Sequence, residues 1–260
     1  MNIVLWTFIA SIAINIVMFV PAFIFKTDKL TDVSYAVTFI VVAIAGFSAS
    51  QQTPLHTLVF LLVLLWALRL GTFLFVRINK IKKDARFDKM RDKFIKFLQF
   101  WLLQGATVFV VMLSSTLGFS QSETSFDAFT TLGLISFFGG LLIESVADAQ
   151  KYRFNSGPNK GTWIDQGVWR MSRHPNYLGE MMVWVGMYFV VFSSFTGYNM
   201  LWALISPLYI ISLLLFVSGV PLLERAANKK WGSNKKYLDY KSEVPVLLPT
   251  PKSIKRCVSK

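Results

Sequence analysis

Cysteine and histidine are nearly absent from this chain. Its 260 residues include one cysteine, Cys257, and two histidines. A single cysteine excludes an internal disulfide framework. These three residues together are too few to fill the four ligand positions of a Cys/His zinc site, so we expect no metal site.

Charge is also scarce, and acidic charge most of all. Charged residues make up 16% of the chain, with 27 Lys and Arg against 14 Asp and Glu. A soluble domain carries about 25% charged residues, so this composition argues against a soluble fold. The net charge of +13 would suggest nucleic acid as the partner of a soluble protein. In a membrane protein the same charge has a simpler explanation, and we expect no nucleic-acid partner.

Apolar residues are in excess. They make up 54% of the chain, with 24 Phe and a mean hydropathy of +0.50. A disordered chain is excluded, because so much apolar surface must be buried. A membrane-spanning helix needs about 20 mostly apolar residues. Seven segments approach this length, at 3–25, 33–49, 55–76, 97–117, 129–147, 177–195 and 200–222.

These segments predict an all-α, polytopic integral membrane protein with seven transmembrane helices. No basic residue precedes the apolar run of 3–25, so we expect an anchor there and not a cleaved signal peptide. No internal repeat or linker divides the chain, which predicts a single membrane domain over residues 1–260.

The basic residues predict the orientation. Of the 27 Lys and Arg, 26 lie in the segments 26–32, 77–96, 148–176 and 224–260, and the other is Arg69. Seven spans place all four segments on one side, which the positive-inside rule assigns to the cytosol. The N-terminus is then outside and the basic tail 224–260 cytosolic, in what we expect to be a bacterial inner membrane. In the loop 77–96, Asp84, Asp88 and Asp92 have helical spacing and predict an amphipathic helix.

Ionisable residues near spans are informative, because burying them in a membrane is costly. Arg69 lies within the third span, where an ion pair with a carboxylate of a neighbouring span is the structural explanation. The remaining polar groups near span ends are Glu144, Asp148, Asn176, Glu180, Glu224 and Arg225. All of them fall in the cytosolic half. They predict a polar cavity, open to the cytosol, between the last three spans and the third.

The segment 147–180 is the densest in polar and aromatic side chains. Arg170 and Arg173 supply planar guanidinium forks that suit phosphate groups. His174 precedes Pro175, and Pro175 favours a helix start whose free N–H groups attract an anion. A lone histidine is more often structural than catalytic, but this cluster exceeds what topology requires.

Several motifs carry a resemblance to a known family. Ser172 to Glu180, with Asp148–Ala149–Gln150–Lys151 before it and Trp66 to Gly71 in the third span, resembles the DUF1295 group of bacterial membrane proteins, related to steroid 5α-reductases. The resemblance covers about residues 30–250. It implies a seven-helix reductase that binds NADPH from the cytosol. It also implies reduction of a carbon–carbon double bond in a lipophilic enone, sterol-like or isoprenoid.

The resemblance also implies site residues. The cofactor-binding set is Asp148, Lys151, Asn159, Arg170, Arg173, His174, Asn176, Tyr177, Glu180, Arg225, Tyr237 and Tyr240. Glu180, Tyr177 and Arg69 are the catalytic candidates. One departure stands out: Trp66 occupies the position of a carbonyl-polarising tyrosine in the steroid enzymes, and its indole lacks an acidic hydroxyl. Arg69, Tyr35 or Tyr177 would then have to polarise the carbonyl.

A second family shares part of the pattern. The Arg-His-Pro-x-Tyr-x-Gly motif also resembles isoprenylcysteine carboxyl and phospholipid methyltransferases, which bind S-adenosylmethionine in a similar cytosolic pocket. Those enzymes carry two adjacent acids later in the chain, whereas Glu224 stands alone here. Together with Asp148–Ala149–Gln150–Lys151, this favours the reductase. A cofactor-free scaffold or lipid-binding protein would leave the carboxylates and arginines unexplained. The oligomeric state stays open.

Overall fold

A computed structural model describes residues 2–81, 87–122, 125–158 and 161–258, and within these ranges it contains helices, turns and bends but no strand. Seven helical segments of the described chain are long and apolar enough to cross a membrane, which confirms the predicted architecture. They are Ile3–Ile24, Lys29–Ser48, Pro54–Asn79, Phe94–Val111, Ala128–Ser156, Pro175–Ser194 and Asn199–Trp231. The predicted second span, 33–49, is among them.

The chain forms two compact units, each built from two stretches of sequence. Unit 1 comprises Met1–Gly133 and Met187–Ser206, and unit 2 comprises Leu134–Gly186 and Pro207–Lys260. Helices α6 (Ala128–Ser156), α7 (Pro175–Val191) and α8 (Asn199–Ser212) contribute residues to both. The single membrane domain stays a prediction, and each unit is described below by itself.

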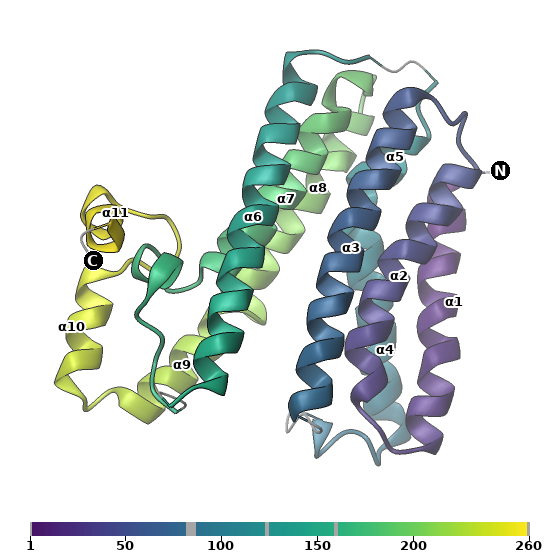
Figure 1. Ribbon diagram of the computed structural model, residues 1–260. Coiled ribbons are helices and arrows are strands. Elements are labelled where there is room, and N and C mark those ends of the chain that lie inside the picture. The colour runs from purple at the N-terminus through teal and green to yellow at the C-terminus, as the bar shows by residue number, and fades with distance from the viewer. Residues whose placement is uncertain (1, 82–86, 123–124, 159–160, 259–260) are drawn as a thin grey trace. The chain divides into compact units, whose positions relative to one another are not determined.

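Unit 1 is a helical bundle held together by apolar and neutral polar contacts. Helix α1 (Ile3–Ile24) packs on α2 (Lys29–Ser48) and α4 (Phe94–Val111), and α2 packs on α3 (Pro54–Ile81), as Figure 1 shows. Many Leu, Ile, Val and Phe side chains on the outer faces of these helices are exposed. In a bilayer these faces contact lipid.

The fourth span is interrupted. Helix α4 ends at Val111, and a separate helix α5 (Leu113–Phe119) follows Met112. Two serines bond carbonyls near the interruption: Ser206 Oγ donates to the Val111 carbonyl, and Ser114 Oγ donates to the Ala203 carbonyl at 2.8 Å. Side-chain hydroxyls can thus bond backbone groups in a span where no water is available. The predicted span 97–117 corresponds to α4 continued by α5.

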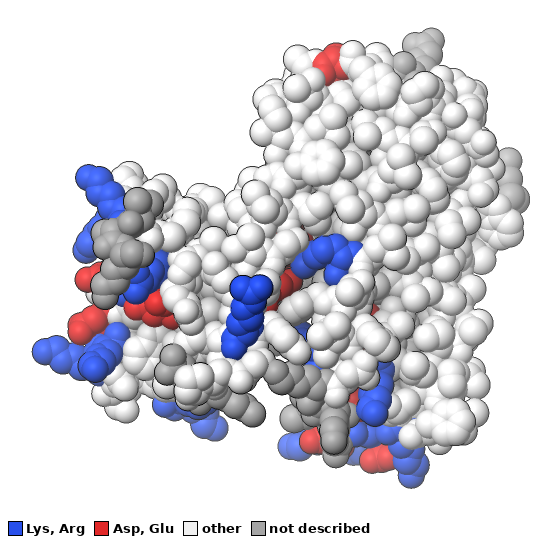
Figure 2. Space-filling model, in the orientation of Figure 1, with Lys and Arg blue, Asp and Glu red and all other residues white. Residues whose placement is uncertain are grey.

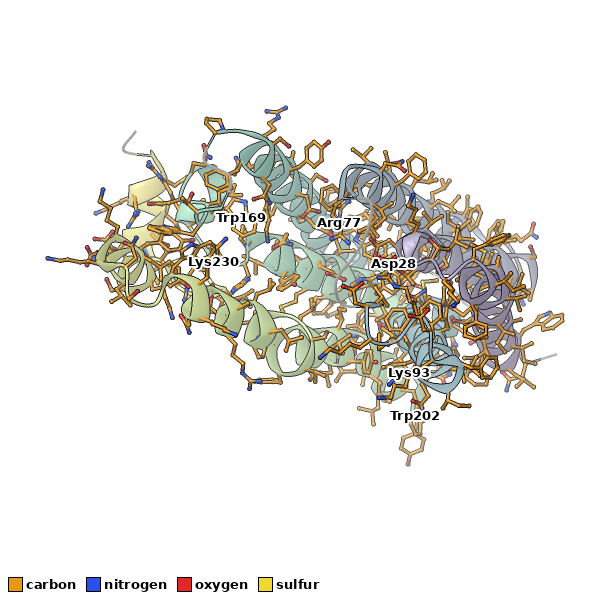
Figure 3. The ribbon with its side chains drawn as sticks, turned by 90° about the horizontal axis from the view of Figure 1, so that it is seen from below. Asp28, Arg77, Lys93, Trp169, Trp202 and Lys230 are labelled. Carbon is orange, nitrogen blue, oxygen red and sulfur yellow. The ribbon has the colours of Figure 1, made fainter. Side chains whose placement is uncertain are left out.

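Several charged side chains of unit 1 form ion pairs near helix ends. The Arg91 guanidinium contacts Asp28 at 3.5 Å and Asp88 at 2.8 Å, and Arg77 contacts Asp32 at 2.7 Å. Asp28 and Arg77 are labelled in Figure 3. The amphipathic helix predicted through the loop is wrong in its described part, because residues 88–92 form turns. These turns bring Arg91 to its two acidic partners.

In unit 2, α6 and α7 approach each other through two glycines. A Cβ added to Gly179 would lie 2.6 Å from the Gly140 carbonyl oxygen, and one added to Gly140 would lie 2.5 Å from the Gly179 carbonyl oxygen. Real Cβ atoms do not approach backbone this closely. Small residues therefore permit the backbone contact that joins the two helices, as is common in membranes.

The last span bends before it ends. Helix α8 continues as a π-helical turn over Leu213–Val217, and α9 (Val220–Trp231) begins after Gly219. A Cβ at Gly219 would lie 2.4 Å from the Leu214 carbonyl oxygen, so glycine is required at this bend. Helices α10 (Lys235–Glu243) and α11 (Pro251–Val258) complete the chain's described part.

Lys and Arg side chains are segregated on the surface. On the face in Figure 2 they gather in the lower part of the view and over the C-terminal helices, with a few at mid-height, and the upper part of that face is nearly free of charge. This distribution agrees with the charge segregation in the sequence. The orientation of the termini stays a prediction.

Candidate functional site

The segment between α6 and α7 is folded against the end of α6. Its 3-10 turn, Gly167–Arg170, begins at a glycine with φ of +56°, a conformation that favours glycine. The Val168 amide donates to Gln150 Oε1 at 3.0 Å, and Trp169 Nε1 donates to the Ala147 carbonyl at 3.1 Å. Both partners lie on α6, so the helix fixes the start of the Arg-His-Pro motif.

Residues 240–257, here called the C-terminal strap, hold the segment from the other side. The Arg173 amide donates to the Pro245 carbonyl at 2.9 Å, and Tyr240 donates its hydroxyl hydrogen to the Trp169 carbonyl at 3.0 Å. Ser253 Oγ donates to the Met171 carbonyl at 2.9 Å. Backbone on both sides therefore positions the residues that precede α7.

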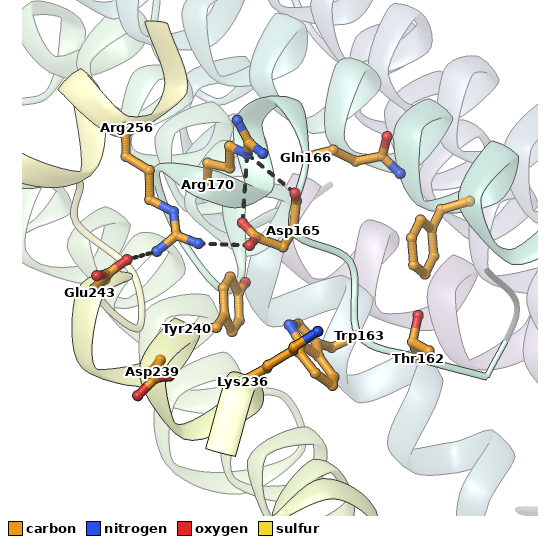
Figure 4. Close-up of a pocket in the computed structure, with 11 residues that line it drawn as sticks. Thr162, Trp163, Asp165, Gln166, Arg170, Lys236, Asp239, Tyr240, Glu243 and Arg256 are labelled. Carbon is orange, nitrogen blue, oxygen red and sulfur yellow. Dashed lines mark hydrogen bonds and ion pairs between the residues drawn. The ribbon is translucent and has the colours of Figure 1, made fainter. Parts of the chain in front are cut away.

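Ion pairs reinforce the strap. Arg256 contacts Asp165 at 2.6 Å and also pairs with Glu243, and Arg170 Nε lies 3.6 Å from Asp165 Oδ1 (Figure 4). These residues line a cavity of about 660 Å³, whose other polar walls include Lys236 and Gln166.

Glu224 of α9 is the centre of a charged cluster, here called the Glu224 cluster. Its carboxylate accepts from Arg173 Nη1 at 2.6 Å, lies 3.0 Å from His174 Nε2, and lies 3.6 Å from Lys241 Nζ. A carboxylate ion only accepts hydrogen bonds, so His174 Nε2 carries a hydrogen. The cluster joins the Arg-His-Pro motif to α9 and α10.

Next to this cluster lies a cavity of about 280 Å³, here called the aromatic cavity. Arg173, His174 and Glu224 form part of its wall, and Lys151 and Lys230 add two further cations. Trp169 and Lys230, both labelled in Figure 3, lie on its wall. Its aromatic lining consists of Trp163, Trp169, Trp231, Tyr237 and Tyr240.

The aromatic rings are packed against one another and against cations. The Trp163 ring lies 5.3 Å from the Tyr237 ring, which in turn lies 5.7 Å from the Trp231 ring. Lys151 Nζ lies 4.8 Å from the Trp169 ring centre, and Lys230 Nζ lies 4.8 Å from the Trp231 ring centre. Such contacts are attractive, because the face of an aromatic ring carries partial negative charge.

Burial changes the acidity of two phenols in this wall. Burial raises the pKa of Tyr240, and the nearby Asp165 charge raises it further. Burial also raises the pKa of Tyr237, with a further contribution from Glu224. Both phenols therefore keep their hydrogens at neutral pH, and Tyr240 acts as a donor to Trp169.

Two buried polar atoms of the cavity wall lack partners. Neither Arg173 Nε nor His174 Nδ1 has a hydrogen-bond partner among the described residues. His174 is only 5% exposed. Buried polar groups are nearly always hydrogen-bonded in folded proteins, and these two atoms belong to adjacent residues that line one cavity.

The aromatic cavity brings together five residues of the predicted cofactor set, namely Lys151, Arg173, His174, Tyr237 and Tyr240. Arg170 lines the larger cavity instead. Asp148 is buried on α6, and Arg225 is exposed on α9.

The first turns of α7 carry Asn176, Tyr177 and Glu180, all half-buried. The Tyr177 ring stacks on the His174 ring at 5.7 Å. Helix α7 begins at Pro175, as the sequence predicts.

Two further predicted site residues are not placed at the aromatic cavity. Arg69 lies on α3 in unit 1, whereas the aromatic cavity lies wholly within unit 2. Asn159 lies outside the described residues. The predicted cavity between the third span and the last three therefore stays a prediction.

Sequence reasoning missed several residues of the site. Glu224 was noted as a polar residue at a span end but not as a partner of the motif. Asp165, Lys241, Trp231 and Arg256 were not singled out. The many cations of the tail, together with Trp231 close to Glu224, were a usable signal, because an acid near a span end needs partners.

A family model described as "Protein of unknown function (DUF1295)" matches residues 18–244. Comparisons with curated proteins and with solved structures found no match.

Proposed function

Since the chain belongs to the DUF1295 family, and a cationic, aromatic-lined cavity adjoins its most specific motif, we propose that it is a membrane-embedded, NADPH-dependent reductase. The reduced bond is the carbon–carbon double bond of a lipophilic enone, sterol-like or isoprenoid. The cofactor enters from the cytosol, and the substrate enters from the bilayer of a bacterial inner membrane.

The charge of the aromatic cavity carries this proposal. Lys151, Arg173 and Lys230 line it against one carboxylate, Glu224, so its wall has an excess of positive charge. NADPH brings several negative phosphate charges, which this excess attracts. S-adenosylmethionine carries a net positive charge, which the same excess repels.

The size of the cavities also fits a dinucleotide. The aromatic cavity of about 280 Å³ is too small for all of NADPH, since sites for drug-sized ligands measure about 300–1,000 Å³. The adjoining cavity of about 660 Å³ shares Phe154, Thr162, Trp163 and Tyr240 with it. A dinucleotide that extends across this shared wall occupies both.

The chain's own residues have separate roles in the proposal. Bound NADPH supplies a hydride. Asn176 and Glu180, one helical turn apart on α7, orient the cofactor, with Asp148, Arg170 and Arg225 as further contacts. Tyr177 or Arg69 polarises the substrate carbonyl.

One observation favours a second candidate, an S-adenosylmethionine-dependent methyltransferase. The aromatic walls already hold ammonium groups over Trp169 and Trp231. A sulfonium ion is attracted to such rings for the same reason. The smaller cavity alone also suits this smaller cofactor.

Equilibrium binding to the detergent-purified protein separates the two. We expect NADPH to bind with an affinity that falls as salt is raised, because charge–charge contacts are screened. Binding of S-adenosylmethionine without NADPH would replace the reductase with the methyltransferase. Binding of neither would remove both.

The orientation in the membrane has its own test. We propose that the N-terminus is outside and that residues 224–260 face the cytosol, because the basic segments follow the positive-inside rule. Cysteine-accessibility mapping in intact cells should protect a label site in this tail. Labelling from outside would reverse the topology and put the cavity on the wrong side for NADPH.

A further inference from the structure

Arg173 is held by Glu224 in a way that limits what it can bind. Its Nη1 donates to Glu224 Oε2 at 2.6 Å, which ties one arm of the guanidinium to a carboxylate. The fork that would suit a phosphate group is therefore partly occupied. The Nε–H group, on the other edge of the guanidinium, is buried and lacks a partner among the described residues.

His174 is limited by the same carboxylate. Its Nε2 carries a hydrogen toward Glu224 Oε1 at 3.0 Å. In the neutral imidazole the other nitrogen, Nδ1, is then a bare acceptor. This Nδ1 is also buried without a partner in the described chain. Glu224 thus fixes one donor, Arg173 Nε–H, and one acceptor, His174 Nδ1, on adjacent residues of the cavity wall.

A donor and an acceptor on adjacent residues of one cavity wall suit a ligand edge that presents the reverse pair. We propose that Arg173 Nε and His174 Nδ1 form a subsite for a planar amide-type edge, which offers an N–H donor and a neighbouring acceptor. The inference rests on the proposed function, because it assigns this subsite to one end of the cofactor. Two parts of NADPH carry such an edge, the nicotinamide carboxamide and the adenine amino edge.

The surroundings suit a planar group of this kind. The wall of the aromatic cavity is formed largely by Trp and Tyr rings, on which a flat heterocycle stacks. An amide-type edge offers an acceptor for the Arg173 Nε–H and a donor for His174 Nδ1, and leaving such buried atoms unpaired is costly. A phosphate group offers acceptors only, so it would leave Nδ1 of a neutral His174 without a donor.

The test uses two substitutions of His174, each of which keeps the contact of one ring nitrogen and loses that of the other. Gln places its amide nitrogen near the position of Nε2, so His174→Gln keeps the contact to Glu224 and loses the acceptor at Nδ1. Asn reaches only the position of Nδ1, so His174→Asn keeps an acceptor there and loses the contact to Glu224. Arg173→Lys keeps a positive charge near Glu224 and loses the Nε–H donor.

The full chain in detergent is tested with four probes: NADPH, reduced nicotinamide mononucleotide, 2′-phospho-ADP-ribose and S-adenosylhomocysteine. We expect His174→Gln and Arg173→Lys each to weaken NADPH about tenfold at unchanged melting temperature. His174→Asn should lower the melting temperature but bind NADPH more tightly than His174→Gln. If these variants bind only the mononucleotide more weakly, the subsite holds the nicotinamide carboxamide. If they bind the two adenine probes more weakly, it holds adenine.

The outcomes separate this inference from the proposed function. If wild type binds NADPH and both His174→Gln and Arg173→Lys bind it equally well, the subsite is wrong and the reductase stands. If the wild type binds S-adenosylhomocysteine but not NADPH, the proposed reductase is wrong. If both variants then bind S-adenosylhomocysteine more weakly than the wild type does, the subsite stands as an adenine subsite. If no probe binds the folded wild type, both are overturned.

Discussion

Each unit contains a buried polar cluster, and the two clusters differ in kind. In unit 1, Asn15 Nδ2 donates to Thr38 Oγ1 at 3.0 Å, and Gln104 Nε2 donates to Asn15 Oδ1 at 3.0 Å and to Ser34 Oγ at 2.9 Å. This neutral cluster joins α1, α2 and α4. In unit 2 the Glu224 cluster joins the Arg-His-Pro motif to α9 and α10 through charge, beside a cavity.

The difference lies in how completely each cluster is satisfied. The Gln104 amide donates to Asn15 and Ser34, and the Asn15 amide donates to Ser11 and Thr38, so the neutral cluster mainly joins helices. The Glu224 cluster leaves Arg173 Nε and His174 Nδ1 without partners in the described chain. We propose that the complete cluster serves the fold, and that the incomplete one beside a cavity binds a ligand. Four tests probe this contrast.

The largest effect is expected at Glu224. Glu224→Ala leaves Arg173 with a buried charge and removes the hydrogen-bond partner of His174. Removing one partner of a mostly buried ion pair costs about 3 kcal/mol or more. We expect the melting temperature in detergent to fall by several degrees, measured by tryptophan fluorescence.

Glu224→Gln is the control, because it keeps one hydrogen-bond acceptor but removes the charge. It should be destabilised less than Glu224→Ala. Equal stability of wild type and Glu224→Ala would mean that the charged cluster contributes nothing to the fold of unit 2.

Glycine contacts give the second test, with a matched pair. Gly179→Ala in unit 2 forces a Cβ to 2.6 Å from the Gly140 carbonyl oxygen, whereas Gly105→Ala in unit 1 brings one to 3.0 Å from the Ser11 carbonyl oxygen. Overpacking against backbone costs about 1–3 kcal/mol, so we expect the upper end for Gly179→Ala and the lower end for Gly105→Ala. Thermal unfolding of both variants checks the order. A larger loss for Gly105→Ala would contradict the packing of α6 on α7.

The third test removes the centre of the neutral cluster. Gln104→Leu keeps the volume of the side chain and deletes the donor to Asn15 and Ser34. Hydrogen bonds between membrane helices contribute on average about 0.6 kcal/mol, so we expect a loss of about 1 kcal/mol for the two together. Because no charge is involved, the loss should not depend on salt, and NADPH affinity should be unchanged. Weaker NADPH binding in this variant would link the neutral cluster to the site.

The sequence predicted the fold better than the site. Seven spans followed from apolar length alone, because a bilayer demands about 20 apolar residues per helix. The start of α7 at Pro175 followed from local rules. The turns at 88–92 did not, because Arg91 pairs with Asp28, which is far away in the sequence. The spacing of residues along the sequence indicates only which nearby residues share a helix face.

The site was predictable in part for the same reason. Arg173 and His174 lie in one motif, so the sequence placed them together. Their partner Glu224 is about 50 residues away, and its role depends on how α9 and the C-terminal strap fold back. The glycine bend at Gly219 and the contacts of residues 240–257 decide this. Such contacts between distant segments leave no periodic signal in a single sequence.

The smallest effect is expected at an exposed charge, which tests whether charge without burial matters. Asp127 in unit 1 is exposed, accepts the Thr130 amide at 3.0 Å, and accepts the Ser193 hydroxyl. These hydrogen bonds, that from Ser193 first, hold its pKa below the usual value. A carboxyl with a lowered folded-state pKa stabilises the fold above its unfolded pKa of about 4, and this contribution is lost as pH falls through the folded-state pKa. Ser193→Ala should therefore lower the melting temperature slightly at pH 7, and the difference from wild type should shrink as the pH falls well below 4. A difference as large as that of Glu224→Ala, or one that does not change with pH, would mean that burial does not decide how much a charged group contributes to stability.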